Sequence, residues 1–207
     1  MLQTLYLIRY GESTANVGGA AVLDKLIELT ARGQEQAQTL LQRLDGQHTT
    51  AVYTSEMRRT QQTAQAMCER WQLSAQVLPC LNEMCPLDFD RIAHVSVEER
   101  RRLAKEYWLQ AACDYQDGPL ADSFTQFDAR VDAFLQLAPS LPNHSMLFTH
   151  GIWIGLLAWK LMGFAVTDVA SKTKFRQFQT AMNMKNTVVY RLCSDSDTGL
   201  RQLAYYA

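Results

Sequence analysis

The fold is decided by residues 5–16, which read LYLIRYGESTAN. The first four of these residues are an apolar run that includes aromatic and β-branched side chains, which is typical of a buried strand. Arg9 follows where that strand ends and a loop containing Gly11 begins. Such a junction can present backbone N–H groups and a guanidinium to an oxyanion. The alternative, from these residues alone, is that Arg9 is an ordinary charged residue at a strand end.

Short apolar runs of this kind recur along the chain and are separated by stretches with helical periodicity. Alternating strands and helices predict an α/β fold, a three-layer sandwich with a mostly parallel central sheet and helices on both faces. The strands are expected at residues 4–8, 51–54, 76–78, 145–149 and 187–192, with a weaker one at 200–206.

Helices are predicted from apolar residues spaced three and four apart and from residues that cap helix N-termini. Ser96 with Glu99, and Ser123 with Gln126, have the spacing of a capping box, and each pair opens a helical pattern. The helices expected from these signals span residues 33–44, 57–71, 96–113, 124–138 and 151–162.

The length of 207 residues suits a single domain, residues 1–207, that carries an insertion. Residues from about 86 to 119 are charged and mostly helical in pattern. We expect them to form a helical cap insertion over the carboxyl edge of the sheet, where ligands bind in open α/β folds.

Composition narrows the expected partners. The formal net charge of −1 argues against nucleic acid and against an anionic membrane surface. The most apolar late stretch, residues 152–164, is shorter than the ~20 residues of a membrane span, and no signal peptide is apparent. The five cysteines are scattered, with no zinc-type cluster and no disulfide framework. We therefore expect a cytoplasmic protein with reduced thiols, no metal and no cofactor, and the oligomeric state stays open.

Further segments complete the pattern that begins at Arg9. Taken in order, they resemble the motifs of the histidine phosphatase (phosphoglycerate-mutase-like) superfamily over nearly the whole chain. Residues 9–16 are similar to the family's Arg-His-Gly-Glu-Ser-x-x-Asn. The other matching segments are Leu29-Thr30-x-x-Gly33-x-x-Gln36-Ala37, Ser55-x-Met57-x-Arg59-Thr60-x-Gln62-Thr63-Ala64, Leu81-Asn82-Glu83, and Phe148-Thr149-His150-Gly151.

The resemblance implies a pocket for the phosphate of a small phosphorylated or anionic molecule. Arg9 and Arg59 are implied to clamp the phosphate oxygens, since a guanidinium matches them in a bidentate manner. Asn16 is implied to add a hydrogen bond. His150 and the helix N-terminus at Gly151 are implied to stabilise the charge that develops on the equatorial oxygens.

Glu83 matches the family's proton-transfer carboxyl, which implies that it protonates the leaving oxygen and then activates water. The residues alone leave simpler alternatives open. Glu83 can be a surface carboxylate after a strand, and His150 can be a core histidine with a hydrogen-bond partner. The register with Ser55 selects Arg59 over its neighbour Arg58 as the second phosphate-binding arginine.

Tyr10 occupies the motif position of the family's nucleophilic histidine. In the family that histidine forms a phosphohistidine, which water discharges quickly. A phenol has an ordinary pKa of about 10 and is mostly protonated at neutral pH, and its phosphate ester resists water. The phenol oxygen also reaches further than an imidazole nitrogen, into the space where phosphorus belongs. We therefore expect the phosphohistidine route to be severely impaired.

Three functional hypotheses follow from this pattern. The leading one is a divergent phosphatase-like protein with an intact anion pocket that acts on or binds a small phosphomonoester. The second is a pseudoenzyme, a pseudophosphatase that binds a ligand or a protein partner. The third is an enzyme of changed chemistry, in which Tyr10 acts as acid, base or nucleophile. Trp153 is the candidate for contact with the substrate, while Ile152, Ile154 and Trp159 are expected to face the core.

Overall fold

The computed structural model describes residues 2–44 and 46–207. Its centre is a six-stranded sheet with the order β3-β2-β4-β1-β5-β6. Neighbouring strands from β3 to β1 run parallel, whereas β5 is antiparallel to β1 and β6 to β5. The expected mostly parallel α/β fold is therefore confirmed. The strands are β1 (Leu2–Arg9), β2 (Val52–Thr54), β3 (Ala75–Val77), β4 (Ser145–Thr149), β5 (Val189–Asp195) and β6 (Arg201–Tyr205).

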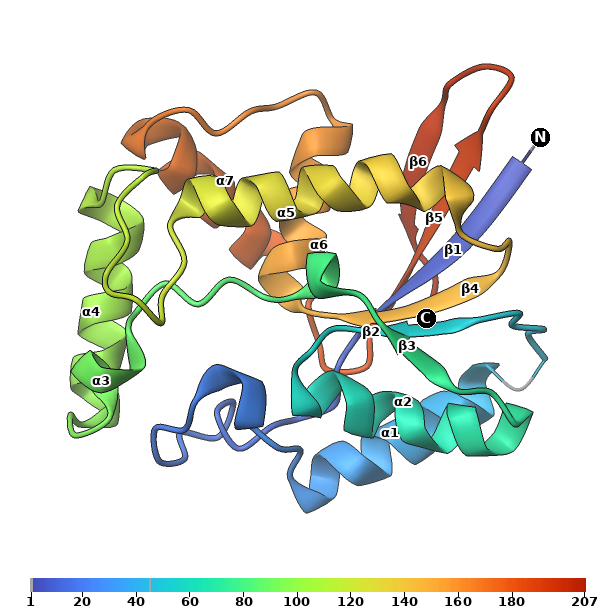
Figure 1. Ribbon diagram of the computed structural model, residues 1–207, viewed down its shortest axis with the longest axis horizontal. Helices are drawn as coiled ribbons and strands as arrows, with labels where there is room; N and C mark the ends of the chain where they lie inside the picture. The colour runs from blue at the N-terminus through green and yellow to red at the C-terminus, as the bar shows by residue number, and fades with distance from the viewer. Residues whose placement is uncertain (1, 45) are drawn as a thin grey trace.

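Helices cover both faces of this sheet (Figure 1). One layer holds α1 and α2, and the opposite layer holds α5, α6 and α7. The helices are α1 (Ala31–Leu44), α2 (Arg58–Trp71), α3 (Phe89–Ile92), α4 (Val97–Gln110), α5 (Phe124–Leu137), α6 (Gly151–Leu161) and α7 (Val169–Ala181), and the short 3₁₀ turns are η1 (Asp24–Leu26), η2 (Pro79–Leu81) and η3 (Ala138–Ser140).

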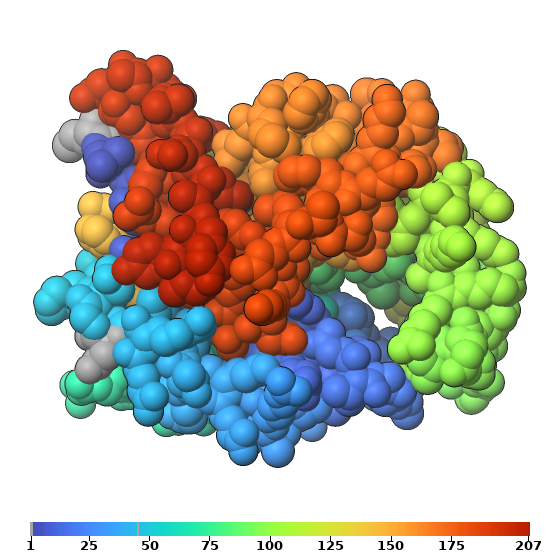
Figure 2. Space-filling model, turned by 180° about the vertical axis from the view of Figure 1, so that it is seen from behind, coloured from blue at the N-terminus to red at the C-terminus, as the bar shows by residue number. Residues whose placement is uncertain are grey.

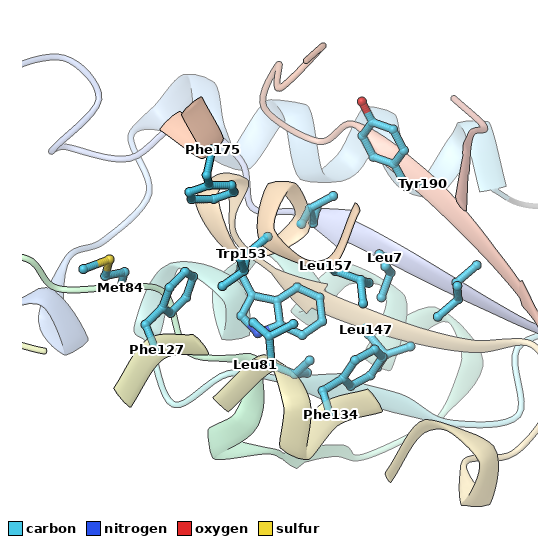
Figure 3. Packing of buried hydrophobic residues seen from close by; sticks show 14 of the residues in the cluster. Leu7, Leu81, Met84, Phe127, Phe134, Leu147, Trp153, Leu157, Phe175 and Tyr190 are labelled. Atoms are coloured by element: carbon cyan, nitrogen blue, oxygen red, sulfur yellow. The ribbon is translucent and has the colours of Figure 1, made fainter. Parts of the chain in front are cut away.

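Strand β1 connects the two layers because its side chains alternate between the two faces of the sheet. Leu5 and Leu7 lie in one core cluster with residues of α5, α6 and α7 (Figure 3). Tyr6 and Ile8 lie in a second cluster with residues of α1 and α2. A strand covered on both faces reads as a continuous apolar run, which explains the pattern at residues 5–8.

The capping signals had different outcomes. At α5 the full capping box is present, since Ser123 accepts from the Gln126 N–H and the Gln126 side chain accepts from the Ser123 N–H. At α4 only half of it forms, with Ser96 accepting from the Glu99 N–H at 3.1 Å, and the helix ends at Gln110 rather than near residue 113.

Helix α7 was not expected from the sequence. Its buried residues include Lys172 and Gln179 beside Phe175, so the apolar stripe that predicts a helix is interrupted. The Lys172 ammonium donates to the carbonyls of Tyr107, at 2.9 Å, and Ala111, which lie at the C-terminal end of α4. Burial lowers the pKa of Lys172. This contact joins α7 to α4.

Residues 86–119 contain α3 and α4, joined by turns and loops. Helix α4 stands beyond the sheet at the side where β1 and β4 end, and it contacts α7 (Figure 1). Among the described helices, none has the length and apolar character needed to span a bilayer.

Candidate active site

The ends of β1 and β4 bring Tyr10 and His150 together. The two strands are parallel neighbours with Arg9 opposite Thr149, and the Tyr10 N–H donates to the Thr149 carbonyl at 3.2 Å. The residues that follow both strands therefore meet at one edge of the sheet. The rings of Tyr10 and His150 lie 5.2 Å apart between centroids.

Two arginines flank the Tyr10 ring. The guanidinium carbon of Arg9 lies 5.3 Å from the ring centroid, and that of Arg59, in the first turn of α2, lies 4.9 Å from it. Both arginines line a cavity of about 370 Å³, and so do Tyr10, Glu83 and Gly151. The structure thus brings together five of the residues expected at the site.

Glycine contacts explain how the first two motifs fit against each other. A Cβ on Gly11 would lie 2.5 Å from the carbonyl oxygen of Gly33, and a Cβ on Gly33 would lie 2.0 Å from that of Glu12. The loop after β1 therefore packs directly on the start of α1. Two further motif side chains accept hydrogen bonds from this loop. The Glu12 N–H donates to the Gln36 Oε1 at 2.7 Å, and the Gly11 N–H donates to the Thr63 Oγ1 at 3.0 Å.

Arg59 is almost fully buried and forms an ion pair with Asp24 of η1. Its Nη2 lies 3.0 Å from the Asp24 Oδ2, and its Nη1 donates to the Asp24 carbonyl at 2.7 Å. Burial opposes the charge of Arg59, but Asp24 beside it leaves the pKa of Arg59 raised. Its Nε is buried without a hydrogen-bond partner among the described residues. The Asp24 carboxylate thus occupies part of the Arg59 guanidinium, which the sequence predicts to bind phosphate.

Arg9 donates from Nη1 to the Met184 carbonyl, while its buried Nε has no hydrogen-bond partner within the described part of the chain. A Cβ on Gly151 would lie 3.4 Å from that Nε, so the first residue of α6 packs closely against the guanidinium. A buried donor without a partner is costly unless a ligand or water satisfies it.

Glu83 caps the N-terminus of α6. Its Oε2 accepts from the Ile152 N–H at 3.0 Å, and its Oε1 accepts from the Trp153 N–H at 3.0 Å. Burial raises the pKa of Glu83, even though hydrogen bonds from the N–H groups of Ile152 and Met84 and the charge of Arg59 act in the opposite direction. A carboxyl with a raised pKa that lines the cavity is suited to proton transfer. The hydrogen bonds of this carboxyl already occupy the N–H groups of Ile152 and Trp153.

His150 is fully buried and does not line the cavity. Its Nε2 is 2.9 Å from the Ser55 Oγ, and its Nδ1 has no hydrogen-bond partner among the residues that the structure describes. Burial, with Arg59 and Arg9 nearby, lowers the pKa of His150 well below its ordinary value. The imidazole is therefore neutral and lies against the ring of Tyr10.

Asn16 and Trp153 do not line the cavity, contrary to the expectation. Asn16 is exposed, and its Oδ1 accepts from Ser13 of its own loop and from Asn186, which precedes β5. Trp153 is fully buried, donates from Nε1 to the Cys80 carbonyl at 2.7 Å and packs on Phe134 (Figure 3). Helix α6 is apolar except for Lys160 in its last turn, and its first turn gives no pattern that distinguishes the side that faces the core.

Arg176 of α7 lines the same cavity, and none of the sequence motifs indicates it. It is half-buried, it donates to the Gln179 side chain, and burial lowers its pKa. The signal that was available is the cap of α7, where the Asp168 carboxylate accepts from the Ser171 N–H at 2.7 Å. Within residues 2–44 and 46–207, no group of three or more His, Cys, Asp and Glu side chains is placed to hold a metal ion.

Comparison with known proteins agrees with this fold. Residues 5–195 match the Histidine phosphatase superfamily (branch 1), and the chain belongs to this superfamily. It is 31% identical over 163 residues to the adenosylcobalamin/alpha-ribazole phosphatase of Escherichia coli (strain K12), covering 77% of this chain and 79% of that protein. It is 32% identical over 170 residues to the probable phosphoglycerate mutase GpmB of Proteus mirabilis (strain HI4320), covering 79% and 76%.

Among solved structures, the alpha-ribazole phosphatase from Shigella flexneri is similar to this chain with a TM-score of 0.72 and 26% identity, over 98% of this chain and 95% of that one. The native mycobacterial glucosyl-3-phosphoglycerate phosphatase has a TM-score of 0.74 at 19% identity, covering 100% and 99%, which shows a shared fold.

Proposed function

We propose that this chain binds small phosphomonoesters in the cavity at the ends of β1 and β4, with a phosphohistidine route that is impaired by Tyr10. The observation that carries the proposal is the pair of guanidinium groups, Arg9 and Arg59, that flank Tyr10 in one cavity with Glu83. The two relatives named above, a phosphatase and a probable phosphoglycerate mutase, support a phosphorylated small molecule as the ligand.

The charges of the cavity support an anionic ligand. Arg9, Arg59 and Arg176 line it. A phosphate supplies acceptor oxygens to the N–H groups of guanidinium side chains. Residues 86–119 serve in this proposal as a cap beside the cavity.

Tyr10 limits the chemistry in this proposal. The motif resemblance puts Tyr10 at the nucleophile position, and its ring lies near the two guanidinium groups and His150. The phenol oxygen then reaches into the space where phosphorus belongs, so the phosphate is displaced from the position that an in-line attack requires. Glu83 is the proton donor to the leaving oxygen, because it lines the cavity and burial raises its pKa.

Two other functions remain as alternatives, each favoured by one observation. The Asp24 carboxylate already pairs with Arg59, which favours a pseudophosphatase that binds a ligand or a protein partner without turnover. Tyr10 itself lines the cavity, with two cations close to its ring, which favours an enzyme that uses the phenol as acid, base or nucleophile.

The test is a panel of phosphomonoesters given to the unmodified chain, Tyr10→His and Tyr10→Phe, with calorimetry of phosphate binding in parallel. We expect Tyr10→His to turn over at least about 10³-fold faster than the unmodified chain, the scale of losing a covalent nucleophile, while all three bind phosphate. Rapid turnover that Tyr10→Phe abolishes would establish tyrosine as a working catalytic group. Phosphate binding without turnover in any variant would favour the pseudophosphatase.

A further inference from the structure

A second cavity, of about 420 Å³, adjoins the anion pocket. Asp24 and Glu83 line both cavities, so the two spaces share these walls. We call the second one the side chamber. Its apolar wall consists of Leu23, Leu26, Met57, Phe89 and Leu120.

Three leucines of the side chamber are unusually exposed for their size. Leu23 is 39% exposed, Leu26 is 47% exposed and Leu120 is 50% exposed. They come from the loop before α1 and from the segment before α5, and they line one cavity. Apolar surface gathered in a concave site is a feature of binding sites for organic ligands.

The charged groups of the side chamber are already paired within the protein. Arg130 lies 2.6 Å from the Asp122 carboxylate, and Lys25 lies 3.1 Å from Glu56. Among the described residues, these two are the cations that line the chamber, and each has a carboxylate beside it. A ligand that brought a second negative charge would meet Asp24 and Asp122 without an unpaired cation to receive it.

The shape of the surface around the site is consistent with one entrance to the anion pocket and the side chamber. Figure 2 shows this face of the molecule hollowed between α4 in light green, α7 in orange and the N-terminal segment in blue. A third cavity in this region is lined by residues of α4 and of the loop before η1, and it shares Asp24 with the other two. Asp24 therefore stands where these spaces meet.

We propose that the side chamber binds the organic part of the phosphomonoester and selects an uncharged apolar or aromatic group over one that carries a second carboxylate or phosphate. This inference rests on the proposed function, because it places the phosphate of the same molecule in the anion pocket. The bridging oxygen of such a ligand lies at the shared wall, beside Glu83.

The first experiment compares ligands by calorimetry on the unmodified chain. Inorganic phosphate, 1-naphthyl phosphate and 3-phosphoglycerate are titrated at one pH. We expect 1-naphthyl phosphate to bind at least about tenfold more tightly than phosphate, since its rings cover the leucines, and 3-phosphoglycerate to bind no more tightly than phosphate. Equal affinities for 1-naphthyl phosphate and phosphate, or a preference for 3-phosphoglycerate, would overturn the proposal.

The second experiment uses variants with a matched control. Leu26→Asn and Leu120→Asn change the side chamber, whereas Leu109→Asn changes a leucine of α4 that is 46% exposed and lies outside it. In each chamber variant we expect the ratio of the affinity for 1-naphthyl phosphate to the affinity for phosphate to fall by at least half, with the phosphate affinity unchanged. We expect Leu109→Asn to keep the ratio of the unmodified chain. A preference that survives both chamber variants would refute the assignment.

A titration with 1-naphthol separates this inference from the proposed function. If phosphate fails to bind, the proposed function fails. The side chamber is then judged by 1-naphthol alone, which is expected to bind the unmodified chain and Leu109→Asn more tightly than Leu26→Asn. Absence of that difference would remove the chamber as a binding site.

Discussion

Replacing Asp24 by asparagine is expected to tighten the binding of inorganic phosphate, because the Asp24 carboxylate occupies the guanidinium of Arg59. The Asp24 Oδ2 lies 3.0 Å from the Arg59 Nη2, and the two side chains are 28% and 3% exposed. A phosphate that uses this guanidinium must displace the carboxylate or lie beside it. The Asp24 carbonyl also accepts from Arg59 at 2.7 Å, and this contact persists in Asp24→Asn, so Arg59 remains held in place.

The size of the effect follows from the distance. At 3.0 Å and an effective dielectric constant of about 20, two unit charges attract by roughly 5.5 kcal/mol. Water screens part of this attraction, since Asp24 is partly exposed, and asparagine still accepts a hydrogen bond. The net gain for phosphate is therefore about 1.4 to 2 kcal/mol, which corresponds to a dissociation constant lower by about 10- to 30-fold.

Calorimetry with inorganic phosphate measures this change, and Glu28→Gln is the matched control. Glu28 pairs with Arg58 at 2.8 Å. Glu28 follows Asp24 in the segment before α1, and Arg58 precedes Arg59 in α2, but the side chains of Glu28 and Arg58 are about half exposed and do not line the anion pocket. We expect Glu28→Gln to leave the phosphate affinity unchanged. An Asp24→Asn variant that melts normally and binds phosphate no better than the unmodified chain would refute the reasoning.

Hydrogen exchange on the unmodified chain gives a second measurement of the same idea. The Leu26 N–H donates to the Leu23 carbonyl at 2.8 Å within the turn that carries Asp24. If phosphate displaces Asp24, the restraint on this turn is released and exchange at Leu26 becomes faster on adding phosphate. Slower exchange would mean that Asp24 stays in place when the anion binds.

Three further predictions concern other groups of the site and its surroundings. In His150→Gln the unfolding free energy should depend less on pH below 6.5, by up to about 1.4 kcal/mol per pH unit. The pKa of His150 is lowered in the folded protein, so the stability that the neutral imidazole contributes is complete above pH 6.5 and is lost as the pH falls. Urea titrations at several pH values measure this dependence, and the same slope in both proteins would contradict the prediction. Lys172→Met should cost about 1–3 kcal/mol in urea unfolding, because carbonyls at the end of α4 lose a charged donor, and an unchanged midpoint would argue against this. Arg176→Gln should weaken phosphate binding by about 3- to 10-fold in calorimetry, through loss of a cation from the cavity wall, whereas an unchanged affinity would place Arg176 outside the anion site.

The part of the site that lies at strand ends was predictable from the sequence. The apolar run before Arg9 and the strand before His150 both predicted parallel strands, and parallel neighbours end at the same edge, which brings Tyr10 beside His150. The capping box at Ser123 likewise located α5, since its signal lies within four residues. A strand run or a capping box is predictable because the residues that determine it are close together in the sequence.

Contacts between distant segments were not predictable in the same way. Asp24 pairs with Arg59 from a loop thirty-five residues earlier in the chain, and no local pattern indicates that contact. Helix α7, with Arg176, was missed because Lys172 interrupts its apolar stripe. The sequence predicts Trp153 at the pocket because the first turns of α6 are apolar and carry no polar residue that would indicate which side faces the core. In each case the side-chain direction is decided by packing against another element.

The charged groups of the anion pocket both attract a phosphate and compete with it. Arg9, Arg59 and Arg176 supply positive charge, while Asp24 already pairs with Arg59 and Glu83 already accepts from two N–H groups in the first turn of α6. A phosphate must therefore compete with carboxylates of the protein, and its binding energy is partly spent on displacing them. Contacts of an apolar group with the side chamber add affinity without that competition, which is why we expect an amphiphilic phosphomonoester to bind more tightly than phosphate alone.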